Sequence, residues 1–164
     1  MTSSQRWRER RDSYRIAGEM IQTSAYEVAT IADDSTPKAF VVQHHYSASY
    51  PAARFRMGLY RTGALVGVAV FSHPCRNEVL TRVFPGDPLA SVELGRFVLL
   101  DDVPANGETW FLARCFRLLR GHVAGVRSMS DPVPRRTLDG RMVTVGHIGC
   151  IYQAHNAVYL VAFF

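Results

Sequence analysis

The stretch Phe55-Arg56-Met57-Gly58-Leu59-Tyr60-Arg61-Thr62-Gly63-Ala64-Leu65-Val66-Gly67-Val68-Ala69-Val70-Phe71 predicts the centre of the fold. Two runs rich in apolar residues, 55–60 and 64–71, flank the turn residues Arg61-Thr62-Gly63, which is the pattern of a β-hairpin. The second run is apolar at successive positions, so neither of its faces suits water. A strand of this kind is normally covered by helices on both sides of its sheet.

Further elements are expected on either side of this hairpin. In chain order, the sequence predicts a helix or arm over 5–24, a strand over 39–42, a strand over 93–100, a helix over 109–120, a strand over 126–130, a helix over 147–155 and a strand over 158–164. We therefore expect an α/β fold with a central, mostly antiparallel sheet flanked by helices. Residues 39–164 form the main domain, and the Arg-rich segment 1–38 is expected to be part of the same domain.

Length and composition are those of one folded domain: 164 residues, of which 48% are hydrophobic and 20% charged. No apolar run is long enough to cross a bilayer, and the residues after Met1 do not resemble a signal peptide, so we expect a cytoplasmic protein without a membrane partner. The three cysteines are far apart and include no Cys-x-x-Cys pair, which favours free thiols over disulfides or a zinc site.

Basic residues outnumber acidic ones by 19 to 14, and all of them except Lys38 are arginines. The guanidinium fork matches phosphate oxygens in a bidentate way, although the codon usage of a GC-rich genome explains the same bias equally well. An early cluster within residues 6–15 is interspersed with acids, as in a solvated surface. A later cluster, Arg135, Arg136 and Arg141, flanks the candidate site and is expected to contact nucleic acid.

The order of the predicted elements from the hairpin onward resembles the core of the GCN5-related N-acetyltransferase (GNAT) fold, over about residues 55–164. In that family, backbone amides of a loop before a helix bind the diphosphate of coenzyme A. Here the loop reads Pro104-Ala105-Asn106-Gly107-Glu108-Thr109, with one glycine and an acid where phosphate would approach. The resemblance implies a GNAT-like catalytic domain over 39–164 that lacks an ordinary coenzyme A site.

A narrower resemblance rests on motifs spread over about residues 44–159. These motifs are His44-His45-Tyr46-Ser47, Gly58-Leu59-Tyr60, Val66-Gly67-Val68-Ala69-Val70-Phe71-Ser72, Glu93-Leu94-Gly95-Arg96-Phe97-Val98-Leu99, Trp110-Phe111-Leu112, Ser130-Asp131-Pro132, Gly146-His147-Ile148-Gly149 and Ile151-Tyr152-Gln153-Ala154-His155-Asn156. Together they resemble the Mom DNA-modification proteins of bacteriophages. The resemblance implies an enzyme, acting in the host cytoplasm, that adds an acetamido (carbamoylmethyl) group to N6 of adenine and so protects phage DNA from restriction.

Asp131 and Tyr152 are the leading candidate catalytic residues, with Ser130 and Tyr60 as further candidates. Adenine N6 is a poor nucleophile because its lone pair is delocalised into the ring, and a carboxylate that accepts a hydrogen bond from the amino group would strengthen it. Asp131 follows a predicted strand and precedes a proline, which suits this role; a turn acid bound to backbone amides is the alternative. Tyr152 would act as an acid toward a leaving group or hold the base, with core packing as its alternative.

The expected partner is double-stranded DNA with the target adenine flipped out of the stack. The candidates for binding the substrate or the donor are Arg96, Tyr46, Thr109 and Asn156. For Arg96, a salt bridge to Asp101 or Asp102 is the alternative. A homodimer is also consistent with this scheme.

The resemblance also implies bound iron. His45, Asp131 and His147 are the predicted ligands of Fe(II), because nitrogen and carboxylate ligands suit that ion. The small molecule that donates the transferred group is not indicated by the sequence.

Two other classes of function remain open. An acyltransferase that acts on a small amine or a protein would bind an acyl-coenzyme A in an altered loop. A DNA-binding accessory protein would keep the fold without the chemistry, and replacing Asp131 would then leave its activity intact.

Overall fold

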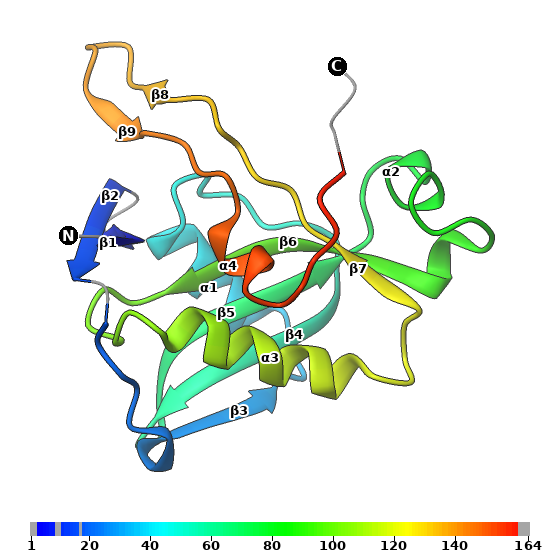
Figure 1. Cartoon of the computed structure of the whole chain (residues 1–164), viewed down its shortest axis with the longest axis horizontal. Coiled ribbons are helices and arrows are strands. Elements are labelled where there is room, and N and C mark those ends of the chain that lie inside the picture. Colours follow the sequence, from blue (N-terminus) through cyan, green and yellow to red (C-terminus); the bar gives the residue numbers. More distant parts are fainter. Residues whose placement is uncertain (1–2, 9–10, 17, 161–164) are drawn as a thin grey trace.

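The computed structural model describes residues 3–8, 11–16 and 18–160, and its centre is a five-stranded sheet (Figure 1). The strands lie in the order β3 (Tyr26–Thr30), β4 (Ala53–Arg61), β5 (Ala64–Ser72), β6 (Ser91–Leu99) and β7 (Gly125–Arg127). The pairs from β3 to β6 are antiparallel, and β6 and β7 are parallel. The predicted hairpin is therefore confirmed as β4 and β5, with β5 in the middle of the sheet.

Both faces of β5 are covered by helices. On one face, α3 (Gly107–Leu119) contributes to a large apolar cluster that includes Phe71 of β5. On the other face, α1 (Ser35–His44) packs against Val68 and Val70. Figure 1 shows α3 in front of the sheet and α1 behind it. The prediction of a strand covered on both sides is confirmed.

The α3 helix also connects β6 to β7. Parallel strands cannot be joined by a tight turn and need a long crossover, which α3 provides. Ser91 of β6 lies opposite Gly125 of β7, so the chain leaves the sheet beside the start of β6. From there it continues directly into Ser130-Asp131-Pro132.

Shorter elements surround the sheet. They are the strand pair β1 (Ser3–Arg8) and β2 (Arg11–Ile16), the strand pair β8 (Arg135–Arg136) and β9 (Met142–Thr144), the 3-10 helices η1 (Thr23–Ala25) and η2 (Pro88–Ala90), and the single-turn helices α2 (Glu78–Thr81) and α4 (Cys150–Gln153). Strand β2 lies against β9, so the N-terminal segment contacts the segment that precedes α4. None of the described helices is long and apolar enough to cross a membrane.

For residues 5–24 the sequence left a helix and an arm open, and the helix is wrong for the described residues: β1 and β2 pair instead, which satisfies backbone groups in a segment without an apolar helical stripe. The strand predicted before the hairpin is also wrong. Residues 39–42 lie in α1 and are not a strand, and this helix crosses the expected boundary between residues 38 and 39. Asp33 accepts a hydrogen bond from the Thr36 amide at 2.9 Å, which stabilises the first turn, and burial against β5 outweighs local strand propensity.

After the hairpin, the predicted strand 93–100 and helix 109–120 are confirmed as β6 and α3. The strand predicted over 126–130 ends at Arg127. The helix predicted over 147–155 is reduced to α4, because Gly146 and Gly149 have φ of +85° and +74°, values that no α-helix contains. Residues 158–160 form no strand, and the rest of that prediction lies outside the described residues.

We predict that Phe111→Ala lowers the free energy of unfolding by about 3–5 kcal/mol, the usual cost of such a cavity. Phe111 is 0% exposed, and its ring stacks on Phe97 with centroids 5.6 Å apart. Urea denaturation followed by circular dichroism measures the loss. Leu118→Ala, on the exposed side of the same helix, is the matched control and should cost less than about 1 kcal/mol. Equal losses for the two variants would contradict the assignment of the buried face of α3.

Candidate active site

The two motifs on either side of the β8–β9 pair lie directly against each other. The His147 amide donates a hydrogen bond to the Asp131 carbonyl at 2.8 Å. A Cβ atom at Gly146 would lie 2.4 Å from the Pro132 carbonyl oxygen, so only glycine fits there. The structure thus brings Ser130-Asp131-Pro132 and Gly146-His147 together across the Arg-rich segment that separates them in sequence.

Tyr152 and Ser130 both lie close to Gly149. A Cβ atom at Gly149 would lie 2.8 Å from Cδ2 of Tyr152 and 3.4 Å from Cβ of Ser130. The Tyr152 side chain packs against the apolar cluster under α3, and this burial, with the nearby Tyr46, raises the pKa of Tyr152 to about 12. The phenol is therefore protonated at neutral pH and can donate a hydrogen bond.

The carboxylate of Asp131 is bound by two neighbours. Oδ2 accepts hydrogen bonds from the Arg135 guanidinium, at 2.7 Å from Nε and 2.5 Å from Nη2, and Oδ1 accepts one from the Val133 amide at 3.1 Å. Partial burial would raise the pKa of Asp131, but these hydrogen bonds and the charges of Arg135 and His147 together lower it below its usual value. Asp131 is therefore ionised at neutral pH. The hydrogen bond from the Val133 amide is also the contact expected under the alternative interpretation, in which Asp131 is a turn acid bound to backbone amides.

Three residues from other elements approach the same place: His45 and Tyr46 after α1, and Arg96 on β6. Burial lowers the pKa of His45 to about 3, and the positive charges of Arg96 and His147 add to this effect. Burial also lowers the pKa of His147, against the attraction of Asp131. We call the set His45, Tyr46, Arg96, Asp131, His147 and Tyr152 the Asp131 cluster.

Arg96 holds the segment after α1 against the sheet. Its Nε donates to the Ser49 carbonyl at 2.9 Å, and its Nη2 donates to the Ser49 hydroxyl at 2.6 Å. The alternative of a salt bridge from Arg96 to Asp101 or Asp102 is wrong, because Asp102 pairs with Arg61 at 2.5 Å at the other end of the sheet. Arg96 thus acts through the loop that carries His45 and Tyr46.

The tautomer of His45 follows from its neighbours. The Ser47 amide donates to Nδ1 of His45 at 3.2 Å, so Nδ1 carries no proton. In the neutral ring the proton is then on Nε2. The His45 side chain is only 8% exposed, and it lies over Tyr46 with ring centroids 4.5 Å apart.

Among the predicted catalytic and substrate-binding residues, Ser130 lies beside the Asp131 cluster at Gly149, whereas Tyr60, Thr109 and Asn156 are not part of it. Tyr60 lines a small pocket at the turn of the β4–β5 hairpin, at the far end of the strand. Thr109 lies in the first turn of α3, where its hydroxyl donates to the Asn106 carbonyl at 3.1 Å. Asn156 is exposed after α4 and has a φ of +56°. The sequence motifs that contain these three residues do not indicate which end of a strand or helix lies at the site.

The loop before α3 is bound by the chain's own side chains. The Ala105 amide donates to Glu19 at 3.1 Å, and Glu19 pairs with Arg15 at 2.6 Å. The Asn106 side chain in turn accepts a hydrogen bond from the Ile21 amide at 2.6 Å. A carboxylate of the chain itself therefore contacts a backbone amide of this loop.

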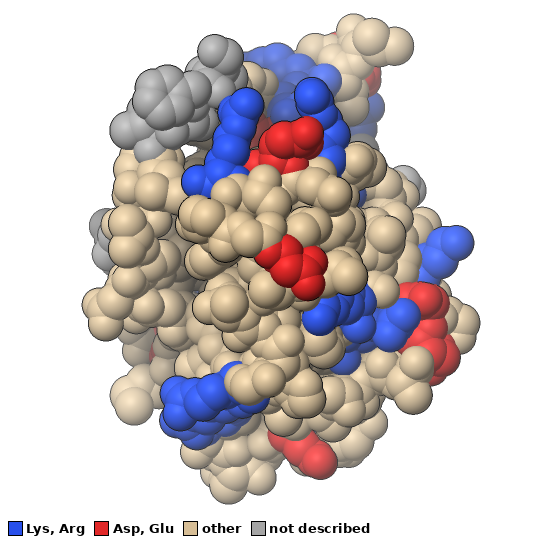
Figure 2. Space-filling model, turned by 90° about the vertical axis from the view of Figure 1, so that its right-hand side faces the viewer, with Lys and Arg blue, Asp and Glu red and all other residues tan. Residues whose placement is uncertain are grey.

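The three arginines predicted to bind DNA are exposed on and beside β8. Arg135 pairs with Asp131 and Arg141 pairs with Asp139, whereas Arg136 donates only to the Gly140 carbonyl, at 2.9 Å, among the interactions of the described residues. Figure 2 shows one face of the molecule, on which the basic side chains form separate groups divided by uncharged surface. On that face there is no continuous basic stripe.

The predicted metal ligands do not form a metal-binding group. Within residues 3–8, 11–16 and 18–160, no three His, Cys, Asp or Glu side chains are arranged to hold a metal ion. Both oxygens of Asp131 are bound to Arg135 and Val133, and Nδ1 of His45 is bound to Ser47. The assignment of Fe(II) to His45, Asp131 and His147 stays a prediction that these contacts do not support.

Glu93 belongs to the surroundings of the cluster and was not among the predicted site residues. It lies on β6, and burial raises its pKa, against the attraction of Arg127 and Arg96. The detectable signal is its position: a carboxylate and an arginine, at 93 and 96, interrupt an otherwise apolar strand. Charged residues are seldom buried in a strand unless they have partners or a function.

A sequence model of the Mom protein family matches residues 25–164. The match begins just before β3 and includes α1, the whole central sheet and every member of the Asp131 cluster. No curated protein matches the chain.

We predict that acid destabilises the protein partly through His45. The pKa of His45 is about 3 in the folded chain and near 6.5 when unfolded, so between these values the unfolded state alone takes up the proton. Stability contributed by the neutral ring is thus complete above pH 6.5 and is lost as the pH falls toward 3.

Urea denaturation at a series of pH values between 7 and 4 measures this slope. His45→Gln should show a flatter decline than the wild type, whatever its stability at pH 7, because glutamine does not titrate. His122→Gln, at an exposed histidine, is the control and should keep the wild-type slope. An unchanged slope in His45→Gln would show that His45 is not held neutral.

Proposed function

Because the chain belongs to the Mom protein family, whose members are phage proteins that modify adenine in DNA, we propose that it transfers an acetamido (carbamoylmethyl) group to N6 of adenine in double-stranded DNA. The observation that carries this proposal is the Asp131 cluster. It combines an ionised carboxylate, a neutral histidine and a protonated phenol at one place. The antiparallel β4–β5–β6 sheet and the parallel β6–α3–β7 unit support the further proposal that the fold is acetyltransferase-like.

Each group of the cluster has a role in this transfer. The ionised Asp131 accepts a hydrogen bond from the exocyclic amino group and increases electron density on N6. Since Arg135 and Val133 hold its pKa down, Asp131 orients the amine and is a weak base. His147 is neutral because burial lowers its pKa, so it is the better acceptor for the proton.

The bond changes balance for an alkylating donor, in which the CH2 carbon of the acetamido group carries a leaving group. The N6–carbon bond forms as the bond between that carbon and its leaving group breaks, and the leaving group departs with the electron pair. N6 loses one proton to His147. Tyr152 donates a hydrogen bond to the departing atom, and Ser130, beside it, assists in holding the transferred group.

The target base must leave the duplex to reach this cluster. Tyr46 contacts the His45 ring and lies close to Tyr152, so two tyrosine side chains are present beside Asp131 to hold an extruded adenine. Extrusion is also consistent with the half-buried position of the cluster beside the exposed β8–β9 pair, to which Arg135 links Asp131. The carboxylate of Glu19 at the loop before α3 gives no support to the alternative of an acyl-coenzyme A donor.

We predict that DNA from cells expressing the protein contains deoxyadenosine heavier by one acetamido group, and that Asp131→Asn reduces this product by at least about 10²-fold. Asparagine keeps the size of the side chain but carries no negative charge, and only one of its two terminal atoms accepts hydrogen bonds. Mass spectrometry of digested DNA measures the product. Asp139→Asn, at an exposed acid of the β8–β9 turn, is the matched control and should modify DNA normally. Unmodified adenine in cells with abundant folded wild-type protein would refute the proposed function.

Arg136→Gln should weaken DNA binding and reduce the slope of log K against log salt by about 0.9, the value for one phosphate contact. The structure places no carboxylate on Arg136 among the described residues, so this guanidinium is available for phosphate. Binding to a fluorescent duplex, measured over a range of NaCl concentrations, gives the slope. Arg82→Gln, at an exposed arginine near α2, serves as the control. If Arg136→Gln left the slope unchanged, Arg136 on β8 would not be part of the DNA interface.

A further inference from the structure

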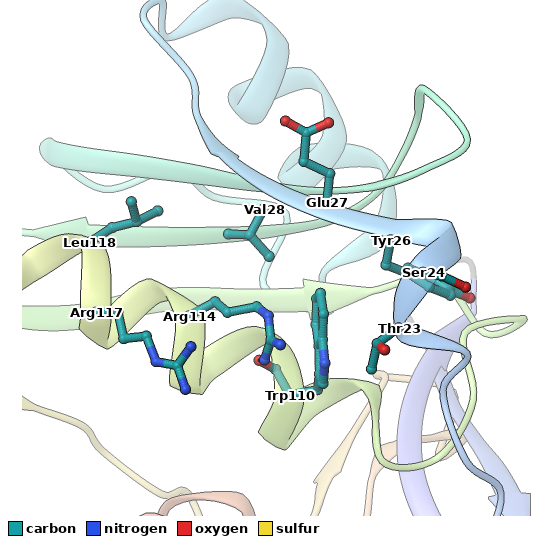
Figure 3. A pocket seen from close by; sticks show the side chains of 9 residues that line it. All are labelled: Thr23, Ser24, Tyr26, Glu27, Val28, Trp110, Arg114, Arg117 and Leu118. Atoms are coloured by element: carbon teal, nitrogen blue, oxygen red, sulfur yellow. The ribbon is translucent and has the colours of Figure 1, made fainter.

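A cavity of about 510 Å³ lies between the edge strand β3 and α3, away from the Asp131 cluster (Figure 3). Tyr26 and Val28 line it from β3, and Trp110, Arg114 and Arg117 line it from α3. A different side of α3 contacts α4. This side carries Phe116, whose ring centroid lies 5.4 Å from the ring centroid of His155. The cavity is therefore separated from the proposed reaction site by the helix itself.

Two arginines dominate the charge of this cavity. Arg114 lies over Trp110, with Cζ 3.4 Å from the ring centroid, and its Nη1 donates to the Trp110 carbonyl at 3.3 Å. No ion pair joins Arg114 or Arg117 to a carboxylate in the part of the chain that the structure describes. Glu27 also borders the cavity, but Figure 3 shows its carboxylate on the opposite side of β3 from the guanidinium groups.

Aromatic side chains form one wall of the cavity. Tyr26 meets the Trp110 ring edge-on, with centroids 6.4 Å apart. The hydroxyls of Thr23 and Ser24 lie at the rim, as Figure 3 shows. The cavity thus combines a planar apolar wall, two hydroxyls at its rim and two guanidinium groups that pair with no carboxylate among the described residues.

We propose that this cavity binds a nucleotide unit, with the phosphate at Arg114 and Arg117 and the base against Trp110, Tyr26 and Val28. Arginine stacked on an aromatic ring keeps its outer N–H groups free for phosphate oxygens. The volume is within the range of small-molecule sites. The unit is either a free mononucleotide or one nucleotide of a strand, since both present the same chemistry. The proposal does not depend on adenine modification at Asp131.

The fluorescence of Trp110 tests this proposal, in a Trp7→Phe background that leaves it as the single tryptophan. Deoxyadenosine 5′-monophosphate and a short single-stranded oligonucleotide are titrated separately, with deoxyadenosine as the probe that lacks phosphate. We expect saturable quenching by the monophosphate, at least about tenfold weaker binding of deoxyadenosine, and about tenfold weaker binding of the monophosphate to Arg117→Gln and to Arg114→Gln. Arg82→Gln should bind as the parent does.

Quenching by the oligonucleotide alone, with the same dependence on Arg114 and Arg117, would also support the site and would assign it to a strand. The proposal would be overturned if neither the monophosphate nor the oligonucleotide quenched the fluorescence, if deoxyadenosine bound as tightly as the monophosphate, or if neither arginine replacement weakened binding. Arg117 is exposed, so its replacement tests the site without disturbing the core. Mass spectrometry of modified DNA is a separate measurement, so failure here leaves the proposed function standing.

Discussion

The burial of β5 on both faces is the constraint on which the rest of the structure depends. Residues 66–72 are all buried, with Phe71 facing α3 and Val68 facing α1. Removing both faces of a strand from water is the largest apolar contribution available to a chain of this size. It requires one helix on each side, so α1 and α3 are held where their ends can carry functional side chains.

The candidate site is built from chain segments that follow these elements. The residues after α1 supply His45 and Tyr46, and the crossover through α3 to β7 delivers the chain to Asp131. The return of the chain after β9 depends on Gly146 and Gly149, both with positive φ, which let residues 146–149 lie against 130–132. A side chain at Gly146 would collide with backbone, which cannot move aside as the end of a side chain can.

Electrostatics then decides the protonation states that the site offers. Hydrogen bonds from Arg135 keep Asp131 ionised, whereas burial keeps His147 and His45 neutral and Tyr152 protonated. These opposite effects arise within one small region because the carboxylate is at its exposed rim and the rings are further inside. The arrangement offers an anion to orient an amine and a neutral ring to accept its proton.

Sequence alone determined the β4–β5 hairpin, β6, α3 and the identity of the Asp131 and Gly146–Tyr152 motifs, since apolar runs and glycines at turns act locally. It did not determine that residues 39–42 form a helix, because packing against β5 outweighed their strand propensity. Nor could it place Tyr60 away from Asp131, or show that Arg135 pairs with that carboxylate. Proximity between residues distant in sequence depends on how the layers pack, and only the tertiary structure decided it.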